Sequence, residues 1–414
     1  MKFLKLKNGL TVVLENLTYA PSASVGAWVR AGAVDEAKNA GISHLIEHMM
    51  FKGTESRTYR QISEDLEKLG TSINAFTTKE ATCFYIKSLS SNLIESVGVI
   101  ADMITNSLFD ESELEKEKGV ICEEMKMIED VPDDLGSDLI QESIFEGTPL
   151  ANRIIGTPES VGAISRGDVV EYVDAMYTAP GIVIACTGMY DEAELTEALE
   201  KGFGKLAGGG APPRAYEAKA LPPSRKTIIK DIEQTHLFLG TKGVSFTDKD
   251  VYALNLYASI LGGGMSSRLF VTVREELGLA YTVYASDCPY KDDGQFTIYA
   301  GVADEKAGDA IYAMRNVISG LAKDGIETDE LSKVKEQYKA SYVFRRESNL
   351  SRMFSTGRNM LLLDRVYTED EILAGVDAVT ADDIARLAAK YADFSHYSTI
   401  TISSKEHDLD AMLA

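Results

Sequence analysis

The sequence predicts an α+β protein made of two homologous domains, each a mixed, mostly antiparallel sheet covered by helices. Three observations support this prediction. A stretch rich in glycine and proline, residues 206–222, divides the chain near its middle. Strand-like runs and longer helical periodicities follow one another in a similar order in both halves. The 414 residues are enough for two domains of ordinary size.

The two halves also carry similar local segments. A turn near Arg57 has a counterpart near Arg268, and the charged helix that opens near Asp110 has a counterpart near Glu327. We therefore expect three parts, namely a first domain, a linker and a homologous second domain: 1–205, 206–222 and 223–414.

The first half begins with strands. Apolar and lysine residues alternate up to Asn8-Gly9 and an apolar run follows, which is typical of a hairpin. Residues 72–77 and 82–87 are strand-like, with a turn around Lys79 and Glu80. Further on, apolar residues recur with helical spacing in two segments: 92–107 and 113–128.

Composition excludes several classes of function. The chain has 42 Lys and Arg against 64 Asp and Glu, a net charge of −22, which disfavours nucleic acid and anionic lipid and favours cationic partners. No apolar stretch approaches the roughly 18 residues that span a bilayer, and the first nine residues lack the apolar core of a signal peptide. The four scattered cysteines are typical of reduced thiols. We therefore expect a cytoplasmic protein.

The segment His44-Leu45-Ile46-Glu47-His48 carries the clearest chemistry. Apolar residues at 42, 45, 46 and 49 form one stripe of a helix, so His44, Glu47 and His48 lie on the opposite face. The two histidines are one turn apart and can reach one metal ion, with Glu47 beside them as a base for water. The alternative is an amphipathic helix with two histidines by chance. Histidine is scarce, five in the chain, which favours the zinc interpretation.

A catalytic zinc site needs a third protein ligand. Glu117 and Glu124 are seven residues apart and share one face of the predicted helix, whereas Glu123 points about 100° away from Glu124. Taken alone, such an acidic run is more often a solvated helix face.

The histidine segment resembles the inverted H-x-x-E-H motif of the inverzincin metallopeptidases, the pitrilysin and insulin-degrading enzyme family. Phe51-Lys52-Gly53-Thr54 and Asn74-Ala75-Phe76-Thr77 are most similar to one branch of it. That branch contains the mitochondrial processing peptidase β-subunit and bacterial processing-peptidase-like proteins. The resemblance runs from about Leu6 through Tyr284 and continues more weakly to the C-terminus.

This resemblance implies roles for individual residues. The segment 120–125 matches the family's third-ligand region, which implies that Glu124 joins His44 and His48 on one Zn²⁺ per chain and that Glu117 supports them. Glu47 is implied as the catalytic base. The remaining implied residues would hold the substrate, three of them by strand addition and two by contacts to its backbone: Asn74, Ala75, Phe76, Arg274 and Tyr281.

The second half does not repeat the zinc residues. The aligned positions are Asn255, Ala258, Ser259, Val334 and Ser341. It does carry Arg274 and Tyr281, which without the family would be ordinary surface and core residues. A glycine run at 262–264 is followed by no Lys-Ser/Thr and therefore does not indicate a phosphate-binding loop.

We expect a zinc endopeptidase that hydrolyses extended or unfolded peptides in an enclosed chamber. The alternative is a catalytically silent structural subunit with the same fold, of a kind that typically loses the zinc motif. The stretch 110–146 holds fourteen acidic residues and three lysines, which suggests basic peptides. The family also implies that a further domain from another chain completes the site, through a homodimer with shared sites or a heterodimer with an inactive homologue.

Overall fold

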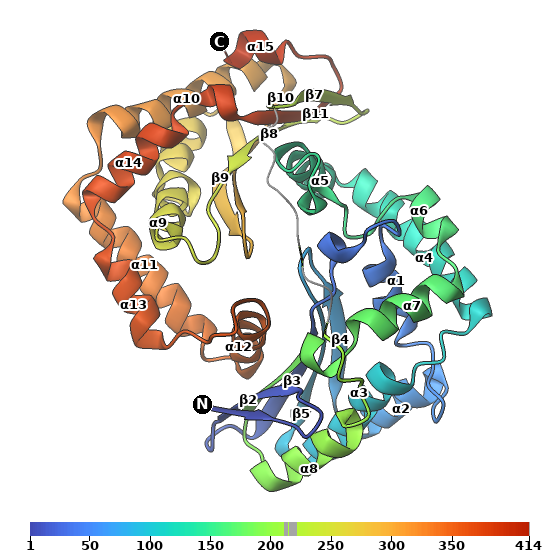
Figure 1. Ribbon diagram of the computed structural model, residues 1–414. Coiled ribbons are helices and arrows are strands. Elements are labelled where there is room, and N and C mark those ends of the chain that lie inside the picture. The colour runs from blue at the N-terminus through green and yellow to red at the C-terminus, as the bar shows by residue number, and fades with distance from the viewer. Residues whose placement is uncertain (211–213, 215–221, 414) are drawn as a thin grey trace. The chain divides into compact units, whose positions relative to one another are not determined.

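The computed structural model describes residues 1–210, 214 and 222–413. Residues 211–213 and 215–221 of the predicted linker therefore lie outside the described residues. The chain forms two compact units, and each takes most of its residues from one half of the sequence and one segment from the other (Figure 1). The first unit comprises Met1–Lys126, Asn152–Tyr216 and Val343–Tyr367. The second comprises Met127–Ala151, Glu217–Tyr342 and Thr368–Ala414.

The sheet of the first unit has six strands in the order β1-β2-β6-β3-β5-β4. Their bounds are β1 Lys2–Lys5, β2 Thr11–Asn16, β3 Ser22–Val29, β4 Ser72–Thr77, β5 Thr82–Leu89 and β6 Ile182–Gly188. Only β2 and β6 pair in parallel. The predicted hairpin is confirmed by β1 and β2, and Gly9 between them has a φ of 92°, which glycine adopts without strain. Strand β4 lies at the edge of this sheet.

Helices cover both faces of the first sheet (Figure 1). One side carries α1, α2 and α3, and the other side carries α12. The bounds are α1 Ile42–Met49, α2 Tyr59–Lys68, α3 Leu93–Asn106, α4 Glu111–Asp130, α6 Pro158–Ala163, α7 Arg166–Met176, α8 Glu192–Phe203 and α12 Asn349–Leu363. Several begin at capping boxes, such as Thr58 with Gln61 and Ser165 with Asp168, which satisfy the first N–H groups of α2 and α7.

The sheet of the second unit has the order β7-β11-β8-β10-β9. Its strands are β7 Arg225–Ile229, β8 Gln234–Lys242, β9 Ala280–Pro289, β10 Gly294–Ala303 and β11 Ser398–Ser403. Only β7 and β11 pair in parallel, at the place that β2 and β6 take in the first sheet. The predicted fold class, two mixed and mostly antiparallel sheets covered by helices, is therefore confirmed.

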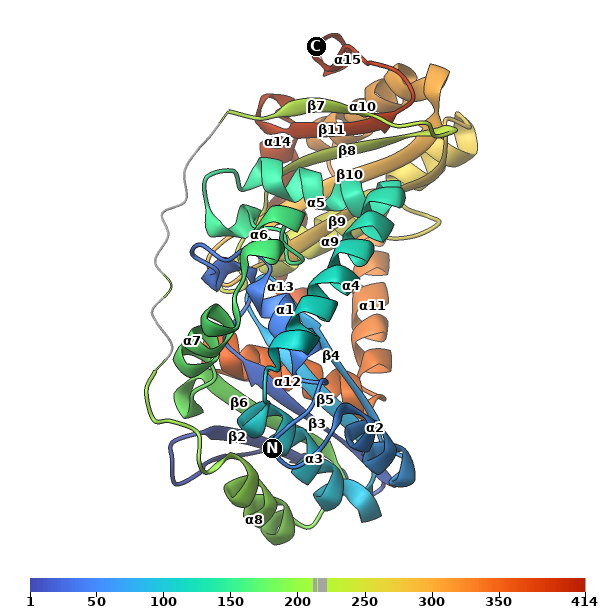
Figure 2. The same ribbon diagram turned by 90° about the vertical axis from the view of Figure 1, so that its right-hand side faces the viewer.

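The helices of the second unit again cover two faces. Helix α5 packs on one side against β8 and β11, and α9, α10 and α14 enclose the main core on the other (Figure 2). The bounds are α5 Pro132–Ile144, α9 Val251–Gly262, the π-helix η5 Phe270–Glu276, α10 Ala307–Asp324, α11 Thr328–Arg345, α13 Glu369–Ala378, α14 Ala381–Tyr391 and α15 Leu409–Leu413. Within the described residues, no helix combines the length and apolarity that crossing a membrane requires.

Each sheet is covered by one helix that comes from the other half of the chain. Helix α12 lies on β3 and β6, where Gly357 approaches the single tryptophan so closely that a Cβ would come within 2.2 Å of Trp28 Nε1. Helix α5 lies on β8, where a Cβ on Gly136 would likewise clash with the ring of Phe238. In both cases the missing side chain lets the helix backbone approach the sheet.

Candidate metal centre

Helix α1 presents the predicted polar face because its other face is fully buried. Ile42, Leu45, Ile46 and Met49 have no exposed surface, which confirms the apolar stripe. The helix begins after Gly41, whose φ of 90° turns the chain into it. Buried Glu36 accepts hydrogen bonds from the N–H groups of Gly41 and Ser43 at 2.7 and 2.8 Å. These bonds satisfy free donors at the helix start, and burial raises the pKa of Glu36 to about 7.

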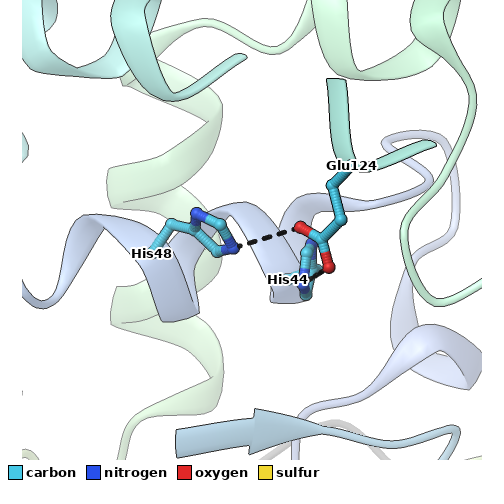
Figure 3. A group of neighbouring side chains, drawn as sticks. All are labelled: His44, His48 and Glu124. Atoms are coloured by element: carbon cyan, nitrogen blue, oxygen red, sulfur yellow. Dashed lines mark ion pairs between the residues drawn. The ribbon is translucent and has the colours of Figure 1, made fainter. Parts of the chain in front are cut away.

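His44, His48 and Glu124 form the only group of three metal-ligating side chains that the described part of the chain holds (Figure 3). Their ligand atoms all lie within 4.8 Å of one another. His44 Nε2 is 3.8 Å from Glu124 Oε1, and His48 Nε2 is 3.6 Å from Glu124 Oε2. The histidines come from α1 and the carboxylate from α4.

The chemistry of this group suits a zinc ion. Both nitrogen–oxygen distances exceed a hydrogen bond and approach the separation of about 3.3 Å between two ligands on tetrahedral zinc. Burial, with a smaller contribution from His48, lowers the pKa of His44 to about 4. His44 is therefore a neutral imidazole near neutral pH, which is the form that binds a metal. The residues present fit the ion.

Glu124, and not its neighbour, completes this group. The Glu123 side chain is 71% exposed and pairs with Lys126 on the same helix at 2.7 Å. A one-residue change of register along α4 would turn the carboxylate about 100° around the helix axis, away from the histidines. Glu124 is thus the carboxylate that lies with the two histidines, at the position where the family resemblance implies a third ligand.

Glu117 supports His48 from behind. Its Oε2 lies 3.1 Å from His48 Nδ1, and its Oε1 lies 2.6 Å from Lys52 Nζ. Only 7% of the Glu117 side chain is exposed. If His48 carries its proton on Nδ1, this contact leaves the Nε2 lone pair directed at the group. Lys52 balances the charge of a carboxylate that would otherwise be buried alone.

Glu47 lies on α1 between the two histidines in sequence and contacts the edge strand of the sheet. Its Oε2 accepts a hydrogen bond of 2.5 Å from Thr77 Oγ1, at the end of β4. Burial raises the pKa of Glu47, while the Thr77 hydrogen bond opposes the increase. A carboxyl group with a raised pKa is a better proton acceptor at neutral pH than an ordinary one.

Asn74, Ala75 and Phe76 lie in β4, and one side of this strand has no partner strand in the sheet. The N–H of Ala75 donates to Asn74 Oδ1 at 2.8 Å. Phe76 faces the side of α12, where its ring lies 5.4 Å from that of Phe354 and 5.6 Å from that of Trp28. The Phe76 side chain thus packs in an aromatic cluster, while the backbone forms the sheet edge.

Arg274 and Tyr281 belong to the second unit, and the structure brings them together. Arg274 lies in η5 with its guanidinium over two rings, 4.7 Å from the centroid of Phe270 and 4.9 Å from that of Tyr281. Tyr281 is the second residue of β9 and has 73% of its surface exposed. The positions aligned with the zinc residues fall on α9 and α11 and offer no imidazole or carboxylate: Asn255, Ala258, Ser259, Val334 and Ser341.

Sequence reasoning missed three residues that shape the site. Thr77 and Lys52 lie in the two segments that resemble the family, but the sequence did not indicate the contact of Thr77 with Glu47 or that of Lys52 with Glu117. Glu36 gave no signal, because a glutamate five residues before Gly41 resembles any other acidic residue of the chain. The roles of Thr77 and Lys52 depend on tertiary contacts, whereas that of Glu36 depends on the local path of the chain into α1.

Comparison with known proteins places the chain in a family. Residues 11–158 match the family described as Insulinase (Peptidase family M16), and residues 163–338 match the family described as Peptidase M16 inactive domain. The uncharacterized zinc protease YmxG of Bacillus subtilis is 38% identical over 383 residues, which cover 92% of this chain and 93% of that protein.

Solved structures share the fold. A peptidase M16 inactive domain from Pseudomonas fluorescens superimposes with a TM-score of 0.91 at 20% identity, covering 98% of both chains. A chain of complex III2 from Candida albicans gives a TM-score of 0.85 at 20% identity, covering 100% of this chain and 98% of that one. The two matched segments together extend over most of the 414 residues. The chain therefore belongs to peptidase family M16, the insulinase family of zinc proteases.

Proposed function

We propose that the protein is a zinc-dependent endopeptidase with one Zn²⁺ per chain, held by His44, His48 and Glu124. The observation that carries the proposal is the convergence of these three side chains from two helices, with Glu47 on the same helix as the histidines. Membership of a family whose relatives are named zinc proteases supports it.

Bound at this group, zinc would polarise the scissile carbonyl and lower the pKa of a water toward neutrality. Glu47 accepts the proton of the attacking water and later delivers it to the leaving amine. Thr77 holds the Glu47 carboxylate through its hydrogen bond, and Glu117 holds the His48 ring. These two contacts fix the base and one ligand before substrate arrives.

The substrate binds as an added strand along β4. We assign this role to the segment Asn74, Ala75 and Phe76, where alternate residues direct their main-chain groups to the open edge. Strand addition uses such groups for affinity. Without substrate, Asn74 Oδ1 accepts the hydrogen bond of the Ala75 N–H. A peptide that pairs with this N–H therefore displaces the Asn74 side chain. This mode selects extended or unfolded peptides because only they can present a free strand.

The direct test measures metal content and cleavage of quenched peptides. Purified protein should contain about one zinc per chain and lose activity to a chelator. Glu47→Gln should keep its zinc and lose roughly 10²–10⁴-fold in turnover, because the isosteric amide cannot accept the proton. A zinc-loaded wild-type protein that cleaves no peptide of a diverse unfolded library would contradict the proposal.

A second candidate function is a silent structural subunit, which the fold shared with a chain of complex III2 favours. The intact His44, His48 and Glu124 group argues against it, because a purely structural subunit has no need of it. The same measurements distinguish the two functions. A silent subunit would cleave no peptide, so Glu47→Gln would have no turnover to abolish.

We further propose a cytoplasmic, processing-peptidase-like enzyme that works as a homodimer with shared sites. Glu47 and the metal-ligating group belong to the first unit, and Arg274 and Tyr281 to the second. In the proposed dimer each site combines Glu47 and the metal-ligating group of one chain with Arg274 and Tyr281 of the other. A heterodimer with an inactive homologue is the alternative. The acidic segment 110–146 would favour basic peptides.

A further inference from the structure

Arg214 stands in the predicted linker, yet its side chain is buried in the first unit. Only 5% of the side chain is exposed. Its Nε and one terminal nitrogen donate to the two carboxylate oxygens of Asp35, both at 2.8 Å. The same terminal nitrogen donates to the backbone carbonyl of Glu80, and the other lies 3.9 Å from Glu80 Oε1.

This arrangement is costly for a residue that only connects two domains. Removing an arginine and a carboxylate from water carries a desolvation penalty that the ion pair often does no more than offset. Asp35 and Glu80 are themselves almost fully buried, with 7% and 6% of their side chains exposed. An exposed linker arginine would avoid the desolvation penalty altogether. The buried contact therefore suggests that Arg214 holds the segments of Asp35 and Glu80 in place.

The first segment that Arg214 holds leads into the metal helix. Asp35 lies in the short 3-10 helix η1, Ala33–Asp35, and its Oδ2 also accepts the N–H of Gly32 at 3.0 Å. The next residue is Glu36, whose carboxyl group takes the N–H groups of Gly41 and Ser43 at the start of α1. Ser43 immediately precedes the ligand His44. Asp35 is therefore connected to the metal helix through its peptide bond to Glu36 and the two hydrogen bonds that Glu36 accepts.

The second segment that Arg214 holds is the turn between β4 and β5. Glu80 lies in this turn, three residues after Thr77, which donates to Glu47. The two segments also touch directly, because the N–H of Val34 donates to the Lys79 carbonyl at 2.9 Å. They approach so closely that a Cβ at Gly32 would come within 2.6 Å of the carbonyl oxygens of the turn.

We propose that Arg214 is a positioning residue that fixes the start of the metal helix against the end of the edge strand. One guanidinium holds both segments, so it sets the distance between α1 and β4 together with the direct Val34–Lys79 contact. Glu47 on α1 and Thr77 on β4 keep their hydrogen bond only while that distance is maintained. The inference rests on the proposed function for its kinetic consequences, but its effect on metal binding is independent of turnover.

The test compares Arg214→Ala and Arg214→Lys with Arg386→Ala. Arg386 also makes a two-point contact with one aspartate, Asp250, at 2.7 and 2.8 Å, through its two terminal nitrogens and in the second unit. Lysine keeps the charge that Asp35 requires, yet one ammonium group cannot reproduce the planar fork. The lysine variant therefore carries the test if the alanine variant fails to fold.

Metal binding is measured by titrating the metal-free proteins with Co²⁺ and recording its visible absorption spectrum. We expect both Arg214 variants to lose about tenfold in Co²⁺ affinity, the lower range for partners that hold metal ligands indirectly. Peptide kinetics should show kcat lowered more than KM is raised. Guanidinium ion at non-denaturing concentration should restore much of the loss in Arg214→Ala, because it refills the vacated position.

Co²⁺ affinity and kinetics indistinguishable from those of Arg386→Ala would overturn the proposal. A loss that appears only as reduced thermal stability, with unchanged Co²⁺ affinity in the folded protein, would also overturn it and leave Arg214 a structural anchor. If the wild-type protein binds Co²⁺ but cleaves no peptide, the proposed function fails, whereas the Co²⁺ affinities still decide the role of Arg214.

Discussion

Thr77 donates a 2.5 Å hydrogen bond to Glu47, which joins the edge strand of the first sheet to the proposed catalytic base. The bond fixes the carboxylate and favours its ionised form, whereas burial favours the neutral form. The same strand would receive the substrate. A peptide that pairs with β4 would therefore be positioned relative to Glu47 by the strand that also holds Glu47.

Thr77→Val should lower kcat by about tenfold, because a hydrogen bond to a charged group is worth roughly 1.5–3 kcal/mol. The Thr77 bond lowers the pKa of Glu47, so its loss raises that pKa and moves the acidic limb of the pH–rate profile to higher pH. Thr77→Ser should retain most activity. Thr105→Val, which removes a hydroxyl from a helix backbone contact on α3, is the matched control. An unchanged acidic limb would contradict this role.

Glu124→Ala should remove zinc from the purified protein, and Glu123→Ala should leave its zinc content unchanged. Glu124 lies with the two histidines, while Glu123 points to solvent and pairs with Lys126. Glu117→Ala should reduce zinc affinity by about 10–100-fold without abolishing it, because Glu117 acts through His48. Metal analysis after dialysis against a competing chelator distinguishes the three. Zinc lost from Glu123→Ala and kept by Glu124→Ala would show that the register is wrong.

The fold class and the polar face of α1 were accessible from sequence because both depend on local sequence patterns, whereas the choice of Glu124 as third ligand came from the family resemblance. The stripe of Ile42, Leu45, Ile46 and Met49 fixes which face of α1 is buried, and hence where His44, Glu47 and His48 point. The sequence did not indicate that α12 and α5 each cover the sheet formed mainly by the other half of the chain. Their partners on the sheets are at least 90 residues away in sequence (from Ile144 to Gln234), and the close approach of Gly357 is visible only once Trp28 lies against it.

The contacts around the site were inaccessible for the same reason. Arg214 and Asp35 are 179 residues apart, and no spacing rule connects an arginine in a glycine-rich stretch with an acidic residue near the start of the chain. Glu117 was suggested by its shared helix face with Glu124. Its second partner, Lys52, comes from the loop after α1 and appears only in the folded chain.

Gly357→Ala should destabilise the first unit by about 1–3 kcal/mol, because the added Cβ meets the Trp28 ring at 2.2 Å and cannot be accommodated without movement of α12. Trp28 is the single tryptophan, so its fluorescence during urea unfolding reports on this unit. Gly98→Ala in α3 is the control, since nothing lies within 4 Å of its added Cβ and alanine favours a helix. Equal midpoints for the two variants would show that the close approach carries no stability.

Peptides with Lys- or Arg-rich flanks should be cleaved faster than matched peptides with Asp- or Glu-rich flanks. Segment 110–146 carries fourteen acidic residues against three lysines, and its helix α4 carries Glu124. The difference should appear in kcat/KM at low ionic strength and shrink as salt screens the exposed charges. Equal rates for the two peptide sets at low salt would assign the acidic residues to solubility alone.

The proposed homodimer can be tested by mixing two variants that are each weak alone. Glu47→Gln removes the base of the first unit, and Tyr281→Phe removes an exposed hydroxyl beside Arg274 in the second unit. In a dimer with shared sites, one site of the mixed species combines an intact Glu47 with an intact Tyr281, and the other carries both defects. With free exchange, half of the dimers are mixed and each holds one intact site, so activity should recover to about a quarter of wild type. Subunit exchange must be verified by native mass spectrometry of tagged chains. No recovery after verified exchange would mean that each chain uses its own Arg274 and Tyr281, or requires a different partner.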